Sequence, residues 1–130
     1  MKRIIYTNDD GSVSIIVPTG AIEDCIKDVP AGKPYQIVDV ADIPTDRTFR
    51  NAWKEDLTVD MPKAKDITHD KRRAKRTAEF APLDIQATIP SKAAQAEADR
   101  QVIRDKYDVM QVSIDAADDV AALKTIVETL

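Results

Sequence analysis

The sequence predicts an α+β fold: a small N-terminal antiparallel β-sheet with one short helix, followed by an extended α-helical hairpin and a short C-terminal helix. Short β-branched runs separated by turn residues fill the first half of the chain, whereas long Ala-rich stretches of helix formers fill the second. The only Trp and one of the two Phe lie where the pattern changes. We therefore predict a small α+β domain over residues 1–61 and a helical region over residues 62–130.

The bulk composition limits the class of protein. The chain has 130 residues, a formal net charge of −4 and one cysteine. A negative net charge does not favour attraction of the whole molecule to nucleic acid, and a single cysteine excludes an internal disulfide and suits a reducing compartment. No apolar run approaches the roughly 20 residues that cross a bilayer, and the N-terminus lacks a signal-peptide pattern. We expect a soluble protein made in a cytoplasm, without membrane association.

The start of the chain predicts a β-hairpin. Residues 3–7 are apolar and β-branched, and residues 12–17 alternate toward an apolar face. The intervening Asn8-Asp-Asp-Gly11 supplies residues that tolerate positive φ in a turn. Pro18 ends the second strand because proline cannot donate to the ladder. We expect the hairpin to tie the N-terminus into a sheet.

Residues 21–29 predict a short helix whose apolar face includes Cys25. A reactive thiol needs a nearby histidine or a cluster of cations, whereas several neighbouring charges are acidic. We therefore expect Cys25 to be a small buried hydrophobe. Residues 35–40 predict a third strand, with Tyr35 and Ile37, and also Val38 and Val40, contributing to the core.

The segment that follows predicts a short helical turn. Pro44 stops the preceding strand, and Thr45 or Asp46 can cap the exposed N–H groups. Phe49 and Trp53 are four residues apart, so both can face the sheet. We expect these two aromatic residues to belong to the core.

A second interpretation of the same segment remains open. Arg47 and Arg50 lie beside Trp53. Trp and Arg are enriched at the energetic centres of protein interfaces. In this alternative the three residues form an anchor that faces a partner.

The first long helix is predicted over residues 63–81, preceded by a last short strand over residues 56–61. Pro82 and Pro90 are expected to punctuate the connection to the second helix. The predicted packing face of the first helix is weakly hydrophobic, and it consists of Ala64, Ile67, Ala74, Ala78 and Ala81, interrupted by Lys71.

Within this helix, residues 71–76 form the strongest charge feature of the chain. The basic residues of this run are Lys71, Arg72, Arg73, Lys75 and Arg76. Such a run can contact phosphates. It can equally be a solvated face that pairs with acids elsewhere in the chain or on an acidic partner. The run is short, lacks interleaved aromatics and matches no groove-reading motif, so nucleic acid is not the favoured partner.

A second long helix is predicted after Ser91, which can act as its N-cap. Its apolar stripe has heptad-like spacing, which favours a helical hairpin or a short bundle contact. The members of the stripe are Ala96, Ile103, Tyr107, Met110 and Ile114. Asp118 or Asp119 is then expected to cap a final short helix that ends near Leu130.

No catalytic constellation is present in the sequence. His69 is the only histidine, and Asp66 and Asp70 are its acidic neighbours. A general base needs a nucleophile or substrate pocket, and a metal site needs more ligands of the right kind. We therefore expect no enzymatic activity, no metal and no cofactor, and a structural or solvent-exposed role for His69.

Several motifs carry a resemblance to a known group. They are Val29-Pro-Ala-Gly32, the aromatic-led strand at Tyr35, the run Pro44-Thr-Asp-Arg-Thr-Phe-Arg-Asn-Ala-Trp53 and Val59-Asp-Met-Pro-Lys-Ala-Lys-Asp-Ile67. Ala81-Pro-Leu-Asp84 and residues 104–123 fit the helical second half of the same group. The chain resembles a group of small proteins encoded by tailed bacteriophages that share Pro-x-Asp-Arg-Thr-Phe-Arg-x-Ala-Trp. The resemblance spans most of the chain and departs from the group's pattern at residues 85–90.

The resemblance implies a structural protein of the virion, in the tail, neck or capsid-associated region, that acts by protein–protein interaction as a homo- or hetero-oligomer with other phage structural proteins. It would be made in the cytoplasm of the bacterial host and located in the virion. The alternatives are a tail or tail-fibre assembly chaperone that is not retained in the particle, or a small nucleic-acid-binding regulator that uses the basic run. The candidate partner-binding residues are Arg47, Arg50, Trp53, Lys71, Arg72, Arg73, Lys75, Arg76, Ile103, Tyr107 and Met110.

Overall fold

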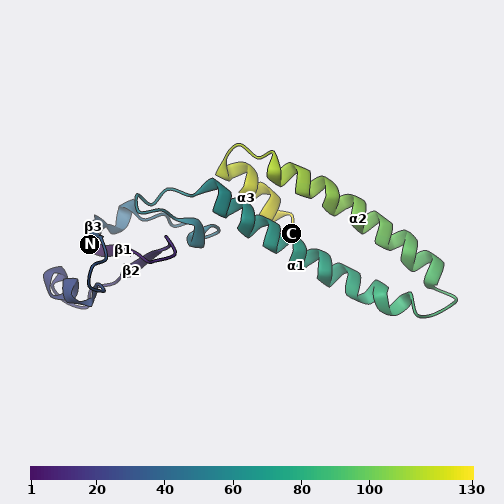
Figure 1. Cartoon of the computed structure of the whole chain (residues 1–130), viewed down its shortest axis with the longest axis horizontal. Helices are drawn as coiled ribbons and strands as arrows, with labels where there is room; N and C mark the ends of the chain where they lie inside the picture. Colours follow the sequence, from purple (N-terminus) through teal and green to yellow (C-terminus); the bar gives the residue numbers. More distant parts are fainter. The chain divides into compact units, whose positions relative to one another are not determined.

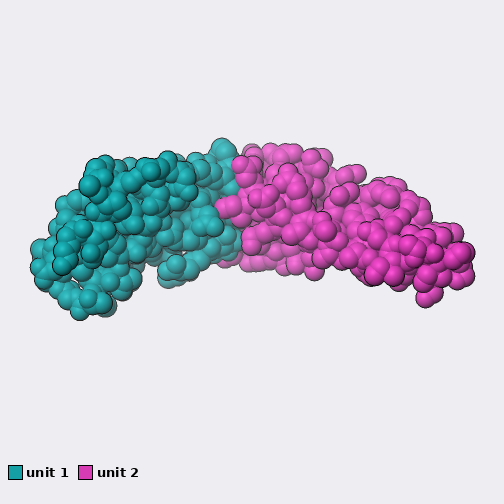
Figure 2. Space-filling view, turned by 60° about the horizontal axis from the view of Figure 1, so that its bottom comes forward, with its two compact units in different colours: residues 1–64 teal, residues 65–130 magenta.

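The computed structural model describes all residues, 1–130, and has the predicted α+β order of elements (Figure 1). The strands and 3-10 helices come first: β1 (Lys2–Thr7), β2 (Val13–Ile16), η1 (Ile22–Asp28), β3 (Tyr35–Asp39), η2 (Val40–Asp42) and η3 (Arg50–Ala52). The helices α1 (Met61–Gln86), α2 (Ala93–Asp115) and α3 (Val120–Glu128) follow. The chain forms two compact units, unit 1 (Met1–Ala64) and unit 2 (Lys65–Leu130), which Figure 2 colours teal and magenta.

The sheet of unit 1 is antiparallel with the order β2-β1-β3, so β1 is central. In the ladders, Ile4 faces both Ile16 and Ile37 across the strands. Both Ile4 and Ile5 are buried, although their side chains point to opposite faces. The sheet is therefore covered on both sides at its centre, and the predicted hairpin is confirmed.

The third strand does not pack as predicted. Tyr35 and Ile37 are 45% and 44% exposed, and Val40, which follows the strand, is also exposed. β3 is an edge strand, so only one of its sides pairs with the sheet. The expectation that these three residues lie in the core is wrong, although the strand itself is present.

Phe49 and Trp53 are buried, as predicted, but only a single 3-10 turn, η3, forms between them. Asp46 does not cap a longer helix. Its carboxylate instead accepts hydrogen bonds from the backbone N–H and hydroxyl of Thr48, at 3.0 and 2.7 Å. This closes a local turn that competes with helix formation.

The same Asp-x-Ser/Thr turn occurs twice more in unit 1. Asp10 accepts from the N–H and hydroxyl of Ser12, and Asp56 accepts from those of Thr58. The turn at Asp56–Thr58 explains why the predicted strand over residues 56–61 does not form. Backbone bonds from Lys54 to Thr58 close a loop, Leu57 has a φ of 65°, and only an isolated bridge joins Trp53 to Val59.

Cys25 lies on η1 and is half-buried rather than fully buried. Its thiol points back to the carbonyl oxygen of Ala21, at 3.8 Å. The element forms at the predicted place and lies beside β1, but as a 3-10 helix without fully buried residues. The more tightly wound 3-10 turn buries less of an apolar face than an α-helix of the same length would.

Helix α1 is longer than predicted, because Pro82 lies inside it and does not end it. Proline removes one hydrogen bond, to the carbonyl four residues earlier. Here that residue is Ala78, and both Ala78 and Pro82 are exposed, so water can satisfy the free carbonyl. The connection to α2 is consequently short. Ser91 is not its cap either, because Lys92 is the N-cap and makes no side-chain capping bond.

Helix α3 begins as the sequence predicts. The Asp119 carboxylate accepts from the backbone N–H of Ala122 at 2.8 Å, and Leu123 is completely buried. α3 contacts α2, and Figure 1 shows it folded back along the helical hairpin. None of the helices is long and apolar enough to cross a membrane.

Candidate interaction surfaces

The inner face of the α1–α2 hairpin is built around Tyr107. The predicted heptad-like stripe of α2 faces inward as expected: Ala96, Tyr107 and Ile114 are buried, and Ile103 and Met110 are half-buried. Three of the candidate partner-binding residues, Ile103, Tyr107 and Met110, therefore contribute to the hairpin itself. In this fold Tyr107, 1% exposed, offers no surface to a partner.

The inward face of α1 is not the Ala stripe that the sequence predicted. Thr68 and Arg72 are buried there, whereas Ala74, Ala78 and Ala81 are exposed. A stripe of Ala supplies little burial energy, and the larger side chains of Thr68 and Arg72 occupy the hairpin interior instead. The predicted packing face is wrong for Ala74, Ala78 and Ala81. Of its other members, Ala64 is buried, in unit 1, and Ile67 is half-buried.

The basic run is split between two faces of α1. Arg72 points inward, and Arg76 lies over the ring of Phe80, 4.9 Å from its centroid. Lys71, Arg73 and Lys75 are exposed, and Arg73 is paired with Asp70 at 2.9 Å. Hence the run presents a smaller outward positive patch than its sequence suggests.

Two basic side chains of α1, Lys65 and His69, contact the C-terminal end of α2. Lys65 donates to the backbone carbonyl of Asp115 at 2.9 Å, and His69 Nε2 lies 2.8 Å from the Asp115 carboxylate. Burial and the neighbouring arginines lower the pKa of Arg72, while Asp115 and Asp108 oppose that shift. A cation stabilises the negative end of a helix dipole, so Lys65 helps to hold the C-terminal end of α2 against α1.

The buried Tyr107 hydroxyl meets no partner at full hydrogen-bond geometry, but it lies close enough to the Glu79 carboxylate for the two groups to interact. Burial and the neighbouring Glu79 carboxylate raise the pKa of Tyr107 to about 12. Burial would raise the pKa of Glu79 as well, but Tyr107 and Lys106 outweigh it and lower that pKa. Lys106 is 3.1 Å from Glu79 and joins the two helices.

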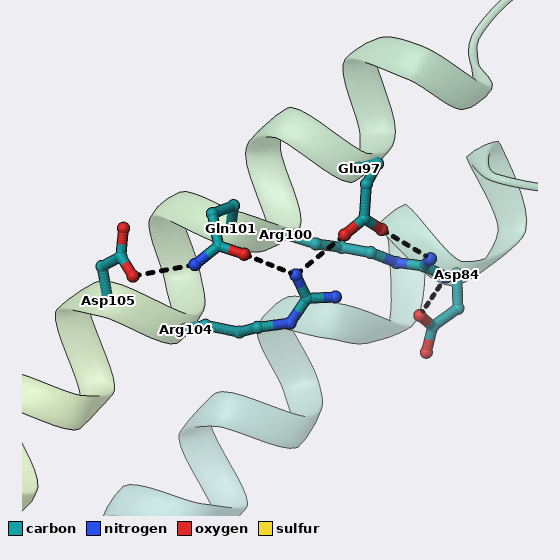
Figure 3. A network of polar contacts seen from close by, with 6 residues as sticks. All are labelled: Asp84, Glu97, Arg100, Gln101, Arg104 and Asp105. Carbon is teal, nitrogen blue, oxygen red and sulfur yellow. Dashed lines mark hydrogen bonds and ion pairs between the residues drawn. The ribbon is translucent and has the colours of Figure 1, made fainter.

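A polar network connects the last turns of α1 with the first half of α2 (Figure 3). Arg100 of α2 reaches Asp84 of α1 at 2.6 Å and Glu97 of its own helix at 3.3 Å. Arg104 donates to Glu97 and to Gln101, and Gln101 in turn donates to Asp105 at 2.9 Å. Arg100 and Arg104 both form ion pairs within the hairpin. Asp105 belongs to the network only through Gln101 and has no ion pair of its own.

A second apolar stripe runs along the opposite side of α2. Val102, Val109 and Val112 are 66%, 68% and 67% exposed. They follow the 3-4 spacing of a heptad, which places them on one helical face. We call this face the outer α2 stripe, and its exposed members are Ala98, Val102, Asp105, Val109, Val112 and Ala116.

Helix α1 has an equivalent outer face. Ile85 is 68% exposed, and the predicted Ala stripe leads to it with the same 3-4 spacing. We call this face the outer α1 stripe, and its exposed members are Lys71, Ala74, Ala78, Ala81 and Ile85. Each long helix of the hairpin therefore has a stripe of mainly apolar residues in solvent, on the side away from the hairpin interior.

The candidate residues of unit 1 separate into core and surface. Trp53 is 1% exposed, so in this fold it is a core residue and not a surface anchor. The Arg50 guanidinium lies over its ring, 4.7 Å from the centroid. Arg47 is exposed and lines an open hollow with Arg3 and Val40.

Two features escaped the sequence analysis although the sequence carries a signal for each. An Asp followed two residues later by Ser or Thr is a known turn signature, and it marks the three turns at Asp10, Asp46 and Asp56. The outer α2 stripe is visible as the valines at 102, 109 and 112. It was missed because one apolar stripe is enough to explain a hairpin helix.

No group of three or more His, Cys, Asp or Glu side chains is arranged to hold a metal ion. Comparisons of the chain with protein-family models, with curated proteins and with solved structures find no match.

Proposed function

We propose that this chain is a structural protein of a tailed-bacteriophage particle, located in the tail, neck or capsid-associated region, and that it acts by protein–protein interaction rather than by catalysis. The phage assignment rests on the resemblance of residues 29–64 to small phage proteins. The mode of action rests on one observation, the solvent-exposed outer α2 stripe.

A helix that is apolar on two faces normally packs on both of them. Isolated surface hydrophobes are common, but Val102, Val109 and Val112 share one face and are each about two-thirds exposed. The hairpin interior contains small or polar buried residues such as Ala96, Thr68 and Arg72. Unit 2 therefore leaves apolar surface that an assembly partner would cover.

The direct test is mass spectrometry of purified particles from a host that carries the gene, with the copy number scaled to the major capsid protein. The expected result is stoichiometric presence of the wild-type chain and loss of a Val109→Lys variant. Gln111→Lys is the matched control, because Gln111 is exposed on the same helix but lies off the stripe. Normal incorporation of Val109→Lys would contradict the proposed mode of action.

Absence of the wild-type chain from particles would favour the alternative of an assembly chaperone that is not retained. In that case Val109→Lys should reduce the yield of complete particles, whereas Gln111→Lys should not. The same outer stripe would be the interface, but the contact would be transient.

A nucleic-acid-binding regulator is the remaining alternative, and the geometry favours it less. Only Lys71, Arg73 and Lys75 of the basic run face outward, and Arg73 is already paired. A gel shift with duplex and single-stranded DNA at low salt tests it. Binding that weakens steeply with salt and is lost in Lys71→Ala/Lys75→Ala would support this alternative.

A further inference from the structure

We propose that a second copy of this chain covers the outer α2 stripe, and that it does so with its outer α1 stripe. This inference rests on the proposed function, which makes the outer faces of the hairpin interfaces, and it names the occupant of one of them. The contact joins unlike faces of two identical chains.

The first argument is the size of the side chains. The outer α2 stripe carries Val102, Val109 and Val112, whereas the outer α1 stripe carries Ala74, Ala78 and Ala81 over most of its length. Both stripes repeat with 3-4 spacing, so their side chains can interdigitate along two helices. Branched side chains then meet small ones, and the helices can approach closely.

The second argument is charge. The outer α1 stripe begins with Lys71, and the outer α2 stripe is interrupted by Asp105. Neither side chain has an ion-pair partner within the chain; Asp105 only accepts a hydrogen bond from Gln101. Two α2 stripes packed in parallel would bring Asp105 close to Asp105 of the other copy, and two α1 stripes packed in parallel would do the same with Lys71. Unlike stripes packed in parallel instead place Lys71 beside Asp105, so each charge has a partner of opposite sign.

The flanking charges have the same distribution. Lys75 lies beside the outer α1 stripe and Asp108 beside the outer α2 stripe, both exposed and without an ion pair in the chain. The α1 side of the hairpin is thus the more basic and the α2 side the more acidic. In the proposed pairing, the exposed Lys71 and Lys75 of the basic run lie at or beside the contact.

A contact between unlike faces is heterologous, so each copy keeps one free α1 stripe and one free α2 stripe at the ends of an assembly. Association of this kind produces a closed ring or an open filament rather than a symmetric dimer. Either form suits a protein that repeats in a particle.

The test is sedimentation equilibrium of the full chain over a range from low micromolar to near-millimolar protein. The expected result for the wild type is a mass that rises above that of the monomer with concentration. Lys71→Glu and Asp105→Lys should each weaken association by roughly tenfold or more, because each places like charges together. The double variant Lys71→Glu/Asp105→Lys should restore it. Circular dichroism checks that each variant keeps its helices.

Three outcomes would overturn the inference. If Asp105→Lys changes association but Lys71→Glu does not, α2 stripes pair with each other. If neither variant changes it, the stripes are not the interface. If the wild type stays monomeric while Val109→Lys still abolishes incorporation into particles, a different protein covers the stripe, and the proposed function survives without this inference.

Discussion

The two units bury very different side chains. The buried residues of unit 1 are all apolar, and they include the large Ile4, Phe49 and Trp53. Unit 2 buries Tyr107, Ile114 and Leu123, but its interior also contains Thr68, Arg72 and small alanines. Its apolar valines are instead outside. The comparison indicates that unit 1 has an entirely apolar core, whereas unit 2 has a partly polar interior and leaves apolar side chains on the outer faces of its hairpin in solvent.

The largest effect should come from emptying the core of unit 1. Phe49→Ala should lower the free energy of unfolding of unit 1 by about 3–5 kcal/mol, because it removes a buried aromatic ring and leaves a cavity. Urea unfolding followed by the fluorescence of Trp53, the only tryptophan, reports on this unit. Tyr35→Ala is the control, since Tyr35 is 45% exposed and should cost far less. Equal losses for the two variants would contradict the assignment of the core.

Tyr107 should make unit 2 sensitive to alkaline pH. Its pKa is about 12 in the folded chain against an ordinary value of 10.0, so the unfolded chain releases this proton first as the pH rises. The corresponding stability is fully present below pH 10 and is lost between pH 10 and 12, amounting to about 2–3 kcal/mol.

The measurement is thermal unfolding followed by helical circular dichroism between pH 8 and 11.5. Tyr107→Phe cannot ionise, and it removes the hydroxyl that interacts with the Glu79 carboxylate. This variant should lose less stability than the wild type as the pH rises. Identical pH profiles would show that Tyr107 is not held neutral by its surroundings.

A smaller effect is expected from the cap of α3. Asp119→Ala removes the carboxylate that accepts from the Ala122 N–H at 2.8 Å, and it should cost unit 2 about 1 kcal/mol. Asp118→Ala is a neighbouring control in which the capping bond is kept. Chemical denaturation followed by helical circular dichroism compares the two variants, and equal stabilities would argue against Asp119 as the cap.

The smallest change in stability is expected at Arg72. Arg72→Met keeps an aliphatic stem of similar shape and removes a buried guanidinium whose Nε has no hydrogen-bond partner. Replacement of a buried charge by a well-packed apolar residue is often neutral or stabilising. We expect a change of about 1 kcal/mol or less in the free energy of unfolding. A loss of several kcal/mol would mean that attraction to Asp108 and Asp115 is essential to the hairpin.

The sequence predicted those parts of the fold that depend on local chemistry and strong patterns. The turn at Asn8–Gly11, the burial of Phe49 and Trp53, the inward stripe around Tyr107 and the cap at Asp119 are all confirmed. Each is set by turn residues, by large apolar side chains or by heptad spacing, and these act within one element.

The predictions that were wrong share a physical cause. In each case the outcome depends on the residues and solvent around the element, which the local sequence does not specify. Tyr35 and Ile37 alternate like core residues, but their strand lies at the edge of the sheet. Pro82 was expected to end its helix, but it lies inside α1 at an exposed position, where water can reach the carbonyl of Ala78 that loses its hydrogen bond. The Ala stripe of α1 was expected to pack inside the hairpin, but Thr68 and Arg72 are buried there instead. The spacing of apolar residues could not show which of the two helix faces packs inward, because the faces are similar in hydrophobicity.

The central question is whether the outer α2 stripe becomes covered when the protein associates. In a Cys25→Ser background, Val109→Cys and Gln111→Cys each provide a single thiol that can be labelled at low and at high protein concentration. Labelling of Val109→Cys should slow strongly as the protein associates, whereas labelling of Gln111→Cys should not. Equal labelling rates for the two variants at every concentration would show that the stripe stays in solvent.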